Sequence, residues 1–114
     1  AIVFLINTDI LPKGKYLYDD TVHAVILLEK GDFTSFFQYI TNKSELKKSS
    51  AIIVLASKNI NSESLIEAGM IAQNIYLAAT SVSLRSVKIL DFHKKVLKEM
   101  IETELNPILL NLIG

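Results

Sequence analysis

Residues Leu65–Leu84 read LIEAGMIAQNIYLAATSVSL, and Glu67 is the only charged side chain among them. Ser64 precedes this stretch, and Ser64 with Glu67 three residues later has the spacing of a capping box at a helix N-terminus. No proline follows within the stretch. We therefore predict a long helix that runs from this cap to about Val82.

Three small residues of this helix, Gly69, Ala72 and Ala79, fall near one stripe because their spacings are three and seven. Small side chains let another backbone approach closely, whereas glycine in an exposed helix costs about 1 kcal/mol relative to alanine. The pattern predicts a helix that packs centrally, in a core or an interface. For Gln73 and Asn74 in the same helix, hydrogen bonds across a dimer or to loop backbone are favoured over a direct ligand contact.

Apolar runs on both sides of the long helix are expected to be strands. Two of them form a hairpin, because only a short polar turn at Asp19 and Asp20 separates them. One run, which includes Ile52 and Ile53, is apolar on both faces and is expected at the centre of the sheet. The six predicted strands are Ala1–Asn7, Lys15–Asp19, Val22–Lys30, Ala51–Ser57, Val87–Leu90 and Ile108–Ile113.

Two shorter helices complete the prediction. Asp32 is expected to cap a helix from Phe33 to about Ile40. Asp91 is expected to cap a final amphipathic helix, accepting hydrogen bonds from the amides of His93 or Lys94. The inward residues of that helix are Phe92, Val96, Met100 and Ile101, and the outward residues are Lys94, Lys95, Lys98 and Glu99.

The composition limits the function classes. The chain has 114 residues, of which half are hydrophobic, with 12 basic and 12 acidic side chains and a net charge of zero. This length supports a single domain over residues 1–114, and the apolar content favours association with a partner. The zero net charge argues against electrostatic binding of nucleic acid. Neither a membrane span nor a targeting segment is evident, so we expect a cytoplasmic protein that binds no membrane.

The sequence contains no clear pattern for a metal site, a phosphate-binding loop or a catalytic nucleophile. The chain contains no cysteine, and His23 and His93 have no second histidine at a ligand spacing. We therefore expect no metal site. No glycine-rich phosphate loop and no nucleophile motif occurs. The residues alone thus assign no catalytic group.

Two stretches resemble the SagB-type dehydrogenases, a branch of the nitroreductase-like flavoproteins. Ile6–Asp32, reading INTDILPKGKYLYDDTVHAVILLEKGD, is similar to the family segment that runs from one strand through a G-L-Y-x-Y-D turn to the next. Leu65–Leu84 is similar to the family's long helix and retains its frame E-A-G-x-x-A-Q-N-x-x-L-A-A. The resemblance covers nearly the whole chain.

This resemblance implies an α+β fold: a nitroreductase-like mixed sheet with a long central helix, incomplete at the N-terminus because the chain begins just after the family's first part. It also implies an intertwined homodimer with FMN at the dimer interface. For the SagB branch it implies oxidation of azoline rings to azoles in peptide maturation, in a peptide-modifying complex with a cyclodehydratase.

The resemblance further implies where the cofactor lies, although this chain departs from the family at both places. Ser83, Leu84 and Arg85 stand where the family has a G-L-G turn, and Leu90, Asp91 and Phe92 stand where a glycine approaches the flavin ring. These six residues are the expected FMN-binding residues, with Arg85 offering charge to a phosphate or a reduced flavin. Because glycine permits a close approach that leucine and aspartate obstruct, two interpretations stay open: an FMN-dependent oxidoreductase, or a non-catalytic scaffold that binds no flavin.

Overall fold

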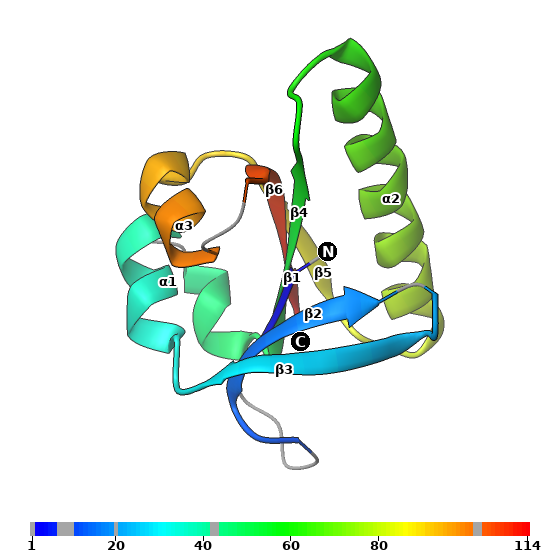
Figure 1. Ribbon diagram of the computed structural model, residues 1–114. Coiled ribbons are helices and arrows are strands. Elements are labelled where there is room, and N and C mark those ends of the chain that lie inside the picture. The colour runs from blue at the N-terminus through cyan, green and yellow to red at the C-terminus, as the bar shows by residue number, and fades with distance from the viewer. Residues whose placement is uncertain (1, 7–10, 20, 42–43, 102–103) are drawn as a thin grey trace.

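The computed structural model describes residues 2–6, 11–19, 21–41, 44–101 and 104–114 (Figure 1). Within these ranges the chain forms strands and helices in an α+β arrangement, which confirms the predicted class. In chain order the elements are β1 (Ile2–Leu5), β2 (Gly14–Asp19), β3 (Ala24–Lys30), α1 (Thr34–Thr41), the 3-10 helix η1 (Ser44–Lys48), β4 (Ala51–Ser57), α2 (Ser62–Ser81), β5 (Ser86–Ile89), α3 (Lys94–Ile101) and β6 (Asn106–Ile113).

All six predicted strands are present, with changes at their ends. β3 begins only at Ala24, because Val22 and His23 belong to the hairpin turn, where His23 has a left-handed backbone with φ of 50°. The sequence placed Ala1 and Asn7 in the first strand and Asp20 in the turn, and these three residues lie outside the described ranges.

The strands form one sheet in the order β3-β2-β1-β4-β6-β5, and every described pairing is antiparallel. The sequence predicts a mixed sheet, and the difference has a topological cause. β4 and β5, which α2 connects, run in the same direction, but β6 lies between them and is antiparallel to both. No two parallel strands therefore become neighbours in the described part of the sheet.

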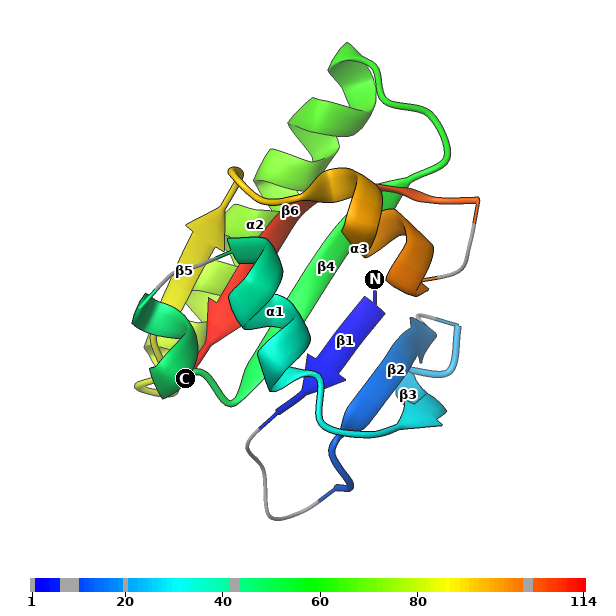
Figure 2. The same cartoon turned by 90° about the vertical axis from the view of Figure 1, so that its left-hand side faces the viewer.

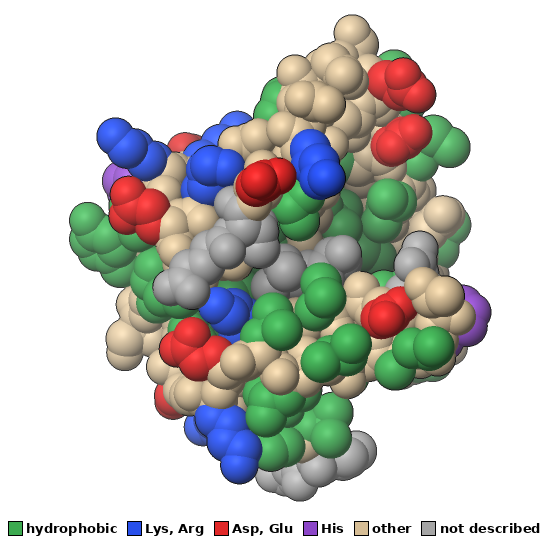
Figure 3. All heavy atoms as spheres, viewed as in Figure 1, with side chains coloured by type: hydrophobic (Ala, Val, Ile, Leu, Met, Phe, Trp, Pro, Cys, Tyr) green, Lys and Arg blue, Asp and Glu red, His purple; other side chains and the backbone are tan. Residues whose placement is uncertain are grey.

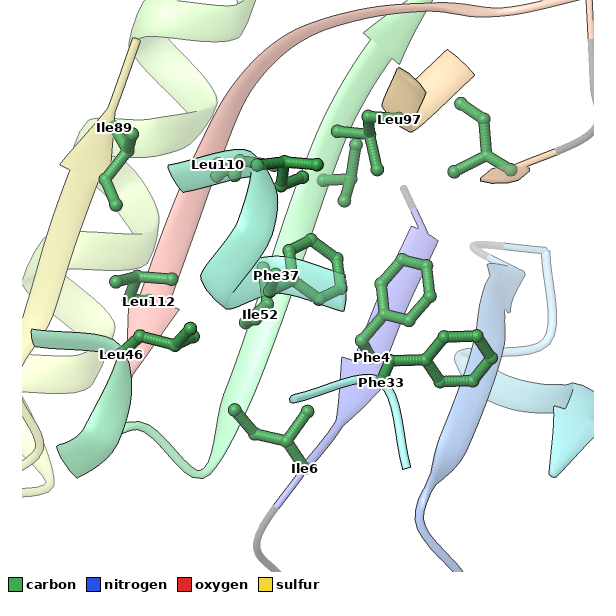
Figure 4. Close-up of a cluster of buried hydrophobic side chains, with 13 residues drawn as sticks. Phe4, Ile6, Phe33, Phe37, Leu46, Ile52, Ile89, Leu97, Leu110 and Leu112 are labelled. Carbon is green, nitrogen blue, oxygen red and sulfur yellow. The ribbon is translucent and has the colours of Figure 1, made fainter. Parts of the chain in front are cut away.

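One face of the sheet is filled by the main hydrophobic core, under α1, η1 and α3 (Figure 2). Phe4 of β1 lies at the centre and meets Phe33 and Phe37 edge to face, with ring centroids 5.0 and 4.7 Å away (Figure 4). Phe33 and Phe37 come together on Phe4 because residues four apart share one side of a helix. Such edge-to-face pairs contribute roughly 0.5–1.5 kcal/mol each beyond their buried area.

Asp32 caps α1, as its position before the helix predicts. Its Oδ1 accepts hydrogen bonds from the Thr34 hydroxyl at 2.6 Å and from the Thr34 amide at 3.0 Å. These bonds, with a smaller contribution from Lys13, hold the pKa of the Asp32 carboxyl below its usual value. The cap fixes where the chain turns from β3 into the helix that carries Phe37.

The long helix α2 begins with a capping box made by a different residue pair from the predicted one. The Asn61 side chain accepts a hydrogen bond from the Ser64 amide, and the Ser64 hydroxyl accepts one from the Asn61 amide, both at 2.9 Å. The predicted pair of Ser64 and Glu67 is thus wrong by three residues, nearly one helical turn, because Asn61 offers an equally good acceptor earlier in the chain.

α2 packs on the opposite face of the sheet, mainly over β4, β5 and β6. Its buried residues are Ala68, Ala72 and Ala79, so two of the three predicted small residues do face the sheet. Gly69 does not, since no atom lies within 4 Å of the position its Cβ would take. The large apolar side chains of α2 point outward instead: Leu65, Ile66, Met70, Ile71, Tyr76, Leu77 and Val82 at its end are exposed.

α2 does not cover the outer strand on its side of the sheet: Tyr16 of β2 is buried, whereas Leu27 of β3 is 38% exposed. Ile53, Val3, Tyr16 and Leu27 are paired neighbours across β4, β1, β2 and β3, and only the Ile53 end of this row packs beside α2. At the outer edge every residue of β3 is exposed. Figure 3 shows hydrophobic side chains gathered over β3 and along α2. We call the outer side of α2 together with the exposed strand β3 the open face.

Two polar side chains are buried on the α2 side of the sheet without a partner among the described residues. The Asn111 amide in β6 is fully buried, and neither its oxygen nor its nitrogen has a hydrogen bond. The buried Ser86 hydroxyl in β5 also has none. A buried polar group without a hydrogen bond costs about 1–3 kcal/mol.

We predict that Asn111→Leu raises the free energy of unfolding by about 1–3 kcal/mol, because it removes an unsatisfied amide and adds apolar contact. Urea unfolding measures the change. Asn106→Leu in the same strand is the matched control, since the Asn106 amide donates to the Lys58 carbonyl at 3.0 Å and its loss should bring no gain. A less stable Asn111→Leu protein would contradict the assignment of Asn111 as unsatisfied.

Candidate functional site

The six predicted FMN-binding residues lie in two groups at opposite ends of β5. Ser83–Arg85 precede the strand and Leu90–Phe92 follow it. A strand of four residues separates its ends by roughly 13 Å. The structure therefore does not bring the two groups together within this chain, and each group has its own surroundings.

Ser83–Arg85 close the C-terminus of α2 and begin the next strand. Ser83 is left-handed with φ of 62°, its amide bonds the Thr80 carbonyl, and the Leu84 amide bonds the Ala79 carbonyl at 2.8 Å. This is the Schellman arrangement that ends many helices, usually with glycine at the left-handed position.

Arg85 extends the sheet by pairing with the end of β6. Its amide and carbonyl both bond Gly114, at 2.8 and 3.0 Å. The adjoining crevice, which Arg85 shares with Lys48 and Val87, has a volume of about 10 Å³, enough for about one water molecule. The backbone of this segment thus has a structural role in the chain.

Leu90–Phe92 form the turn between β5 and α3. The Leu90 side chain is 64% exposed, Asp91 is exposed, and Phe92 packs against the main core. α3 begins only at Lys94, and the His93 amide donates to the Ile40 carbonyl at 3.1 Å. The prediction that Asp91 caps this helix is therefore wrong, because a bond to the end of α1 takes the amide that the cap required.

Leu90 lines a groove at the end of the sheet, between the start of α2 and α3. Its volume is about 460 Å³. We call it the lysine groove, and its lining residues are Ile60, Leu65, Leu90, Lys94, Lys95, Lys98, Asn106, Pro107 and Ile108. The groove joins three segments that are distant in the sequence.

A β-bulge shapes one wall of the lysine groove. Leu55 pairs with Leu109 and Ala56 pairs with Pro107, so Ile108 is an extra residue in β6. Bulges re-aim side chains and are common beside functional sites. Ile108 borders both the lysine groove and a second cleft of about 400 Å³, which runs along α2 toward Tyr18 and contains Glu67.

The charge of the lysine groove has one sign. Among the described residues, three lysines of α3 line it and no acidic side chain does. Lys98 is held in place by donating to the Leu105 carbonyl at 3.1 Å, and the Lys94 ammonium lies 5.8 Å from the centre of the Phe92 ring. The sequence predicted these lysines to face outward, which is correct, but gave no sign that they share a groove. The feature of the sequence that could have indicated a shared site is the position of these lysines directly after the expected flavin turn.

The lysine groove is suited to an anionic ligand with an apolar body. Its volume lies within the roughly 300–1,000 Å³ of small-molecule sites, and such sites combine apolar walls with a few placed polar groups. A metal centre has no comparable basis, since no three His, Asp or Glu side chains gather in the described part of the chain. In that same part, no helix has the length and apolar character needed to span a membrane.

Replacing Ser83 with glycine should raise the free energy of unfolding by about 0.5–1 kcal/mol. A left-handed conformation costs an L-residue roughly 1–2 kcal/mol of free energy, and glycine avoids this cost. Glycine has more conformational entropy in the unfolded state, which offsets part of the gain in stability. Urea unfolding measures this, with Ser81→Gly inside α2 as the control that should lose stability by about 0.5–1 kcal/mol. A loss in both variants would mean that Ser83 is not held in the left-handed conformation.

Comparison with known proteins supports the fold. No protein-family model and no curated protein matches the sequence. Among solved structures, the chain superposes on a candidate nitroreductase from Anabaena variabilis ATCC 29413 with a TM-score of 0.89 and 17% sequence identity. The match covers 99% of this chain and 26% of that chain, so the present chain spans about a quarter of its neighbour's length. The chain has a nitroreductase-like fold.

Proposed function

We propose that this chain is part of an FMN-dependent oxidoreductase of the nitroreductase kind, with the flavin beside the Leu90–Phe92 turn in the lysine groove. The observation that carries the proposal is the groove itself: an apolar space of about 460 Å³ with three cations, next to the expected flavin turn. The nitroreductase-like fold supports the same reading.

The residues of the groove fit a flavin in chemical character. Leu65, Pro107 and Ile108 offer apolar surface for a flat ring, and the lysines offer charge for a phosphate or for a reduced, anionic ring. FMN, when bound, supplies two-electron transfer. The chain's own part is to bind and orient the ring and to stabilise negative charge through cations at the groove wall.

The finer proposal concerns the substrate. The retained helix frame in Leu65–Leu84 favours the SagB kind of reaction, a two-electron oxidation of an azoline ring in a peptide to an azole. A peptide-modifying complex would then supply the azoline. This part of the proposal rests on the sequence resemblance, and no residue of the described structure is assigned a catalytic role.

We also propose that two copies of the chain associate through the open face. α2 has no charged residue after Glu67, and its exposed side includes Met70, Ile71 and Leu77, an apolar surface of the kind that usually meets a partner. Exposed Val25 and Leu27 continue the apolar surface on β3. A symmetric homodimer would bury α2 on the side that the sheet leaves free.

One observation favours the alternative, a scaffold without flavin. Leu90 and Asp91 stand at the turn where the related flavoproteins have a glycine, and the Leu90 side chain occupies the groove wall. If this side chain fills the place of the ring edge, the fold serves as an interaction domain in the same kind of complex.

FMN titration of the purified protein, followed by flavin fluorescence and absorbance, tests the proposal. We expect saturable binding that Leu90→Asp weakens at least tenfold, because a carboxylate would then face an anionic ligand in an apolar groove. Leu11→Asp is the matched control: Leu11 is also an exposed leucine, 41% against 64%, but it does not line the lysine groove.

Equal weakening by the two substitutions would place the flavin elsewhere. Absence of saturable binding to the unsubstituted protein would favour the scaffold. In that case Leu90→Gly becomes informative, since recovery of binding in this variant would identify the leucine as the obstruction.

A further inference from the structure

The cleft of about 400 Å³ along α2 is a second cavity of binding size, and its charge is opposite to that of the lysine groove. Its floor is apolar and well packed, because Leu55 of β4, Ala68 of α2 and Ile108 of β6 line it and are each 4–6% exposed. The end of β2 and the first half of α2 form its two sides (Figure 1). Small-molecule sites have volumes of roughly 300–1,000 Å³ and such apolar floors.

Glu67 gives this cleft a single negative charge. Glu67 lines the cleft, and among the described residues no basic side chain does. None of the ion pairs in the described part of the chain includes Glu67. Lys58, the nearest cation along the chain, also lies outside the lining. The carboxylate is therefore available to a cationic ligand.

The structure of α2 does not require this carboxylate. The capping box uses Asn61 and Ser64, so Glu67 does not have the capping role that the sequence predicts for it. Glu63 lies in the first turn, where the helix dipole favours an acidic side chain, but Glu67 comes one turn later. Neither a cap nor the first-turn preference thus explains why a charge stands at this position.

An aromatic ring lies on the strand side of the cleft. Tyr18 of β2 lines it, and the Tyr18 hydroxyl is 3.1 Å from Nδ1 of His23 in the hairpin turn, within hydrogen-bond distance. This contact restricts the position of the ring. Ser57 and Ser64 add hydroxyl oxygens to the lining. A carboxylate, a ring face and hydroxyl oxygens all present negative potential, and such groups favour an organic cation.

We propose that the cleft binds an organic cation, a primary ammonium group on an apolar body. The ammonium would face Glu67 and the Tyr18 ring, and the body would lie on the apolar floor. A metal ion is disfavoured, because one carboxylate cannot supply the several oxygen ligands that such ions need. Flavin binding is a separate matter, since neither Glu67 nor Tyr18 lines the lysine groove.

The test compares benzylamine, which is protonated at neutral pH, with benzyl alcohol, which has nearly the same shape and no charge. Titration followed by protein NMR shifts measures both affinities. We expect the ammonium to bind at least about fivefold more tightly, because a partly exposed ion pair and a cation–π contact each contribute a factor of about two to five. Glu67→Gln should bring this ratio close to one. Glu63→Gln is the matched control outside the cleft and should leave the ratio unchanged.

Two substitutions of Tyr18 separate the ring from the hydroxyl. Tyr18→Phe keeps the ring and should keep most of the preference for the ammonium. Tyr18→Leu removes the ring and should lower the preference about two- to fivefold. Both variants should fold, since Tyr18 is 38% exposed, and circular dichroism checks this. An unchanged preference in folded Tyr18→Leu would overturn the placement of the ammonium at the ring.

Equal affinity of the unsubstituted protein for the two probes, or no binding of either, would overturn the inference. A preference that survives Glu67→Gln would do the same, as would one that both glutamate variants lose equally. Sedimentation of Glu67→Gln adds a check, because a shift between monomer and dimer would show that the carboxylate faces a second copy of the chain and not a ligand. FMN titration should be unchanged in Glu67→Gln, so this site and the flavin site can fail separately.

Discussion

The contact between α2 and the sheet is made by alanines, and the rest of the molecule depends on this. Ala68, Ala72 and Ala79 let the helix lie close to β4, β5 and β6, but they bury little apolar area. The large side chains of α2 consequently face away from the sheet. The opposite face, where Phe4 meets Phe33 and Phe37, contains the larger core and so contributes most to the stability of the chain. The α2 side keeps its large apolar side chains exposed.

Elements that depend on local pattern were predictable from the sequence. Alternating and continuous apolar runs located all six strands, and Asp32 identified the start of α1. The long helix was predictable for the same reason, since caps and a break-free apolar stretch determine it locally. Its C-terminus, predicted at about Val82, is confirmed, since α2 ends at Ser81 with Val82 as the C-cap; the left-handed Ser83 that follows takes a position that glycine usually occupies.

Features that depend on contacts between distant segments were not predictable. Asp91 satisfied the local rule for a cap, but the His93 amide bonds Ile40, which is more than fifty residues earlier in the chain. The lysine groove combines Ile60 and Leu65 with α3 and with the bulge at Ile108, and no spacing in the sequence links these segments. The family resemblance named six residues as FMN-binding residues; they lie at the two ends of β5, and of the six only Leu90 lines the lysine groove.

The proposed pairing of two copies through the open face depends on the exposed side chains of α2 and β3. Sedimentation velocity at micromolar concentration tests this most directly, with circular dichroism to confirm folding. A homodimer gives a species of about twice 12.7 kDa. The double substitution Met70→Lys and Leu77→Lys, at two exposed residues of α2, should convert it to a folded monomer. A folded, unsubstituted chain that sediments only as a monomer near 12.7 kDa would contradict it.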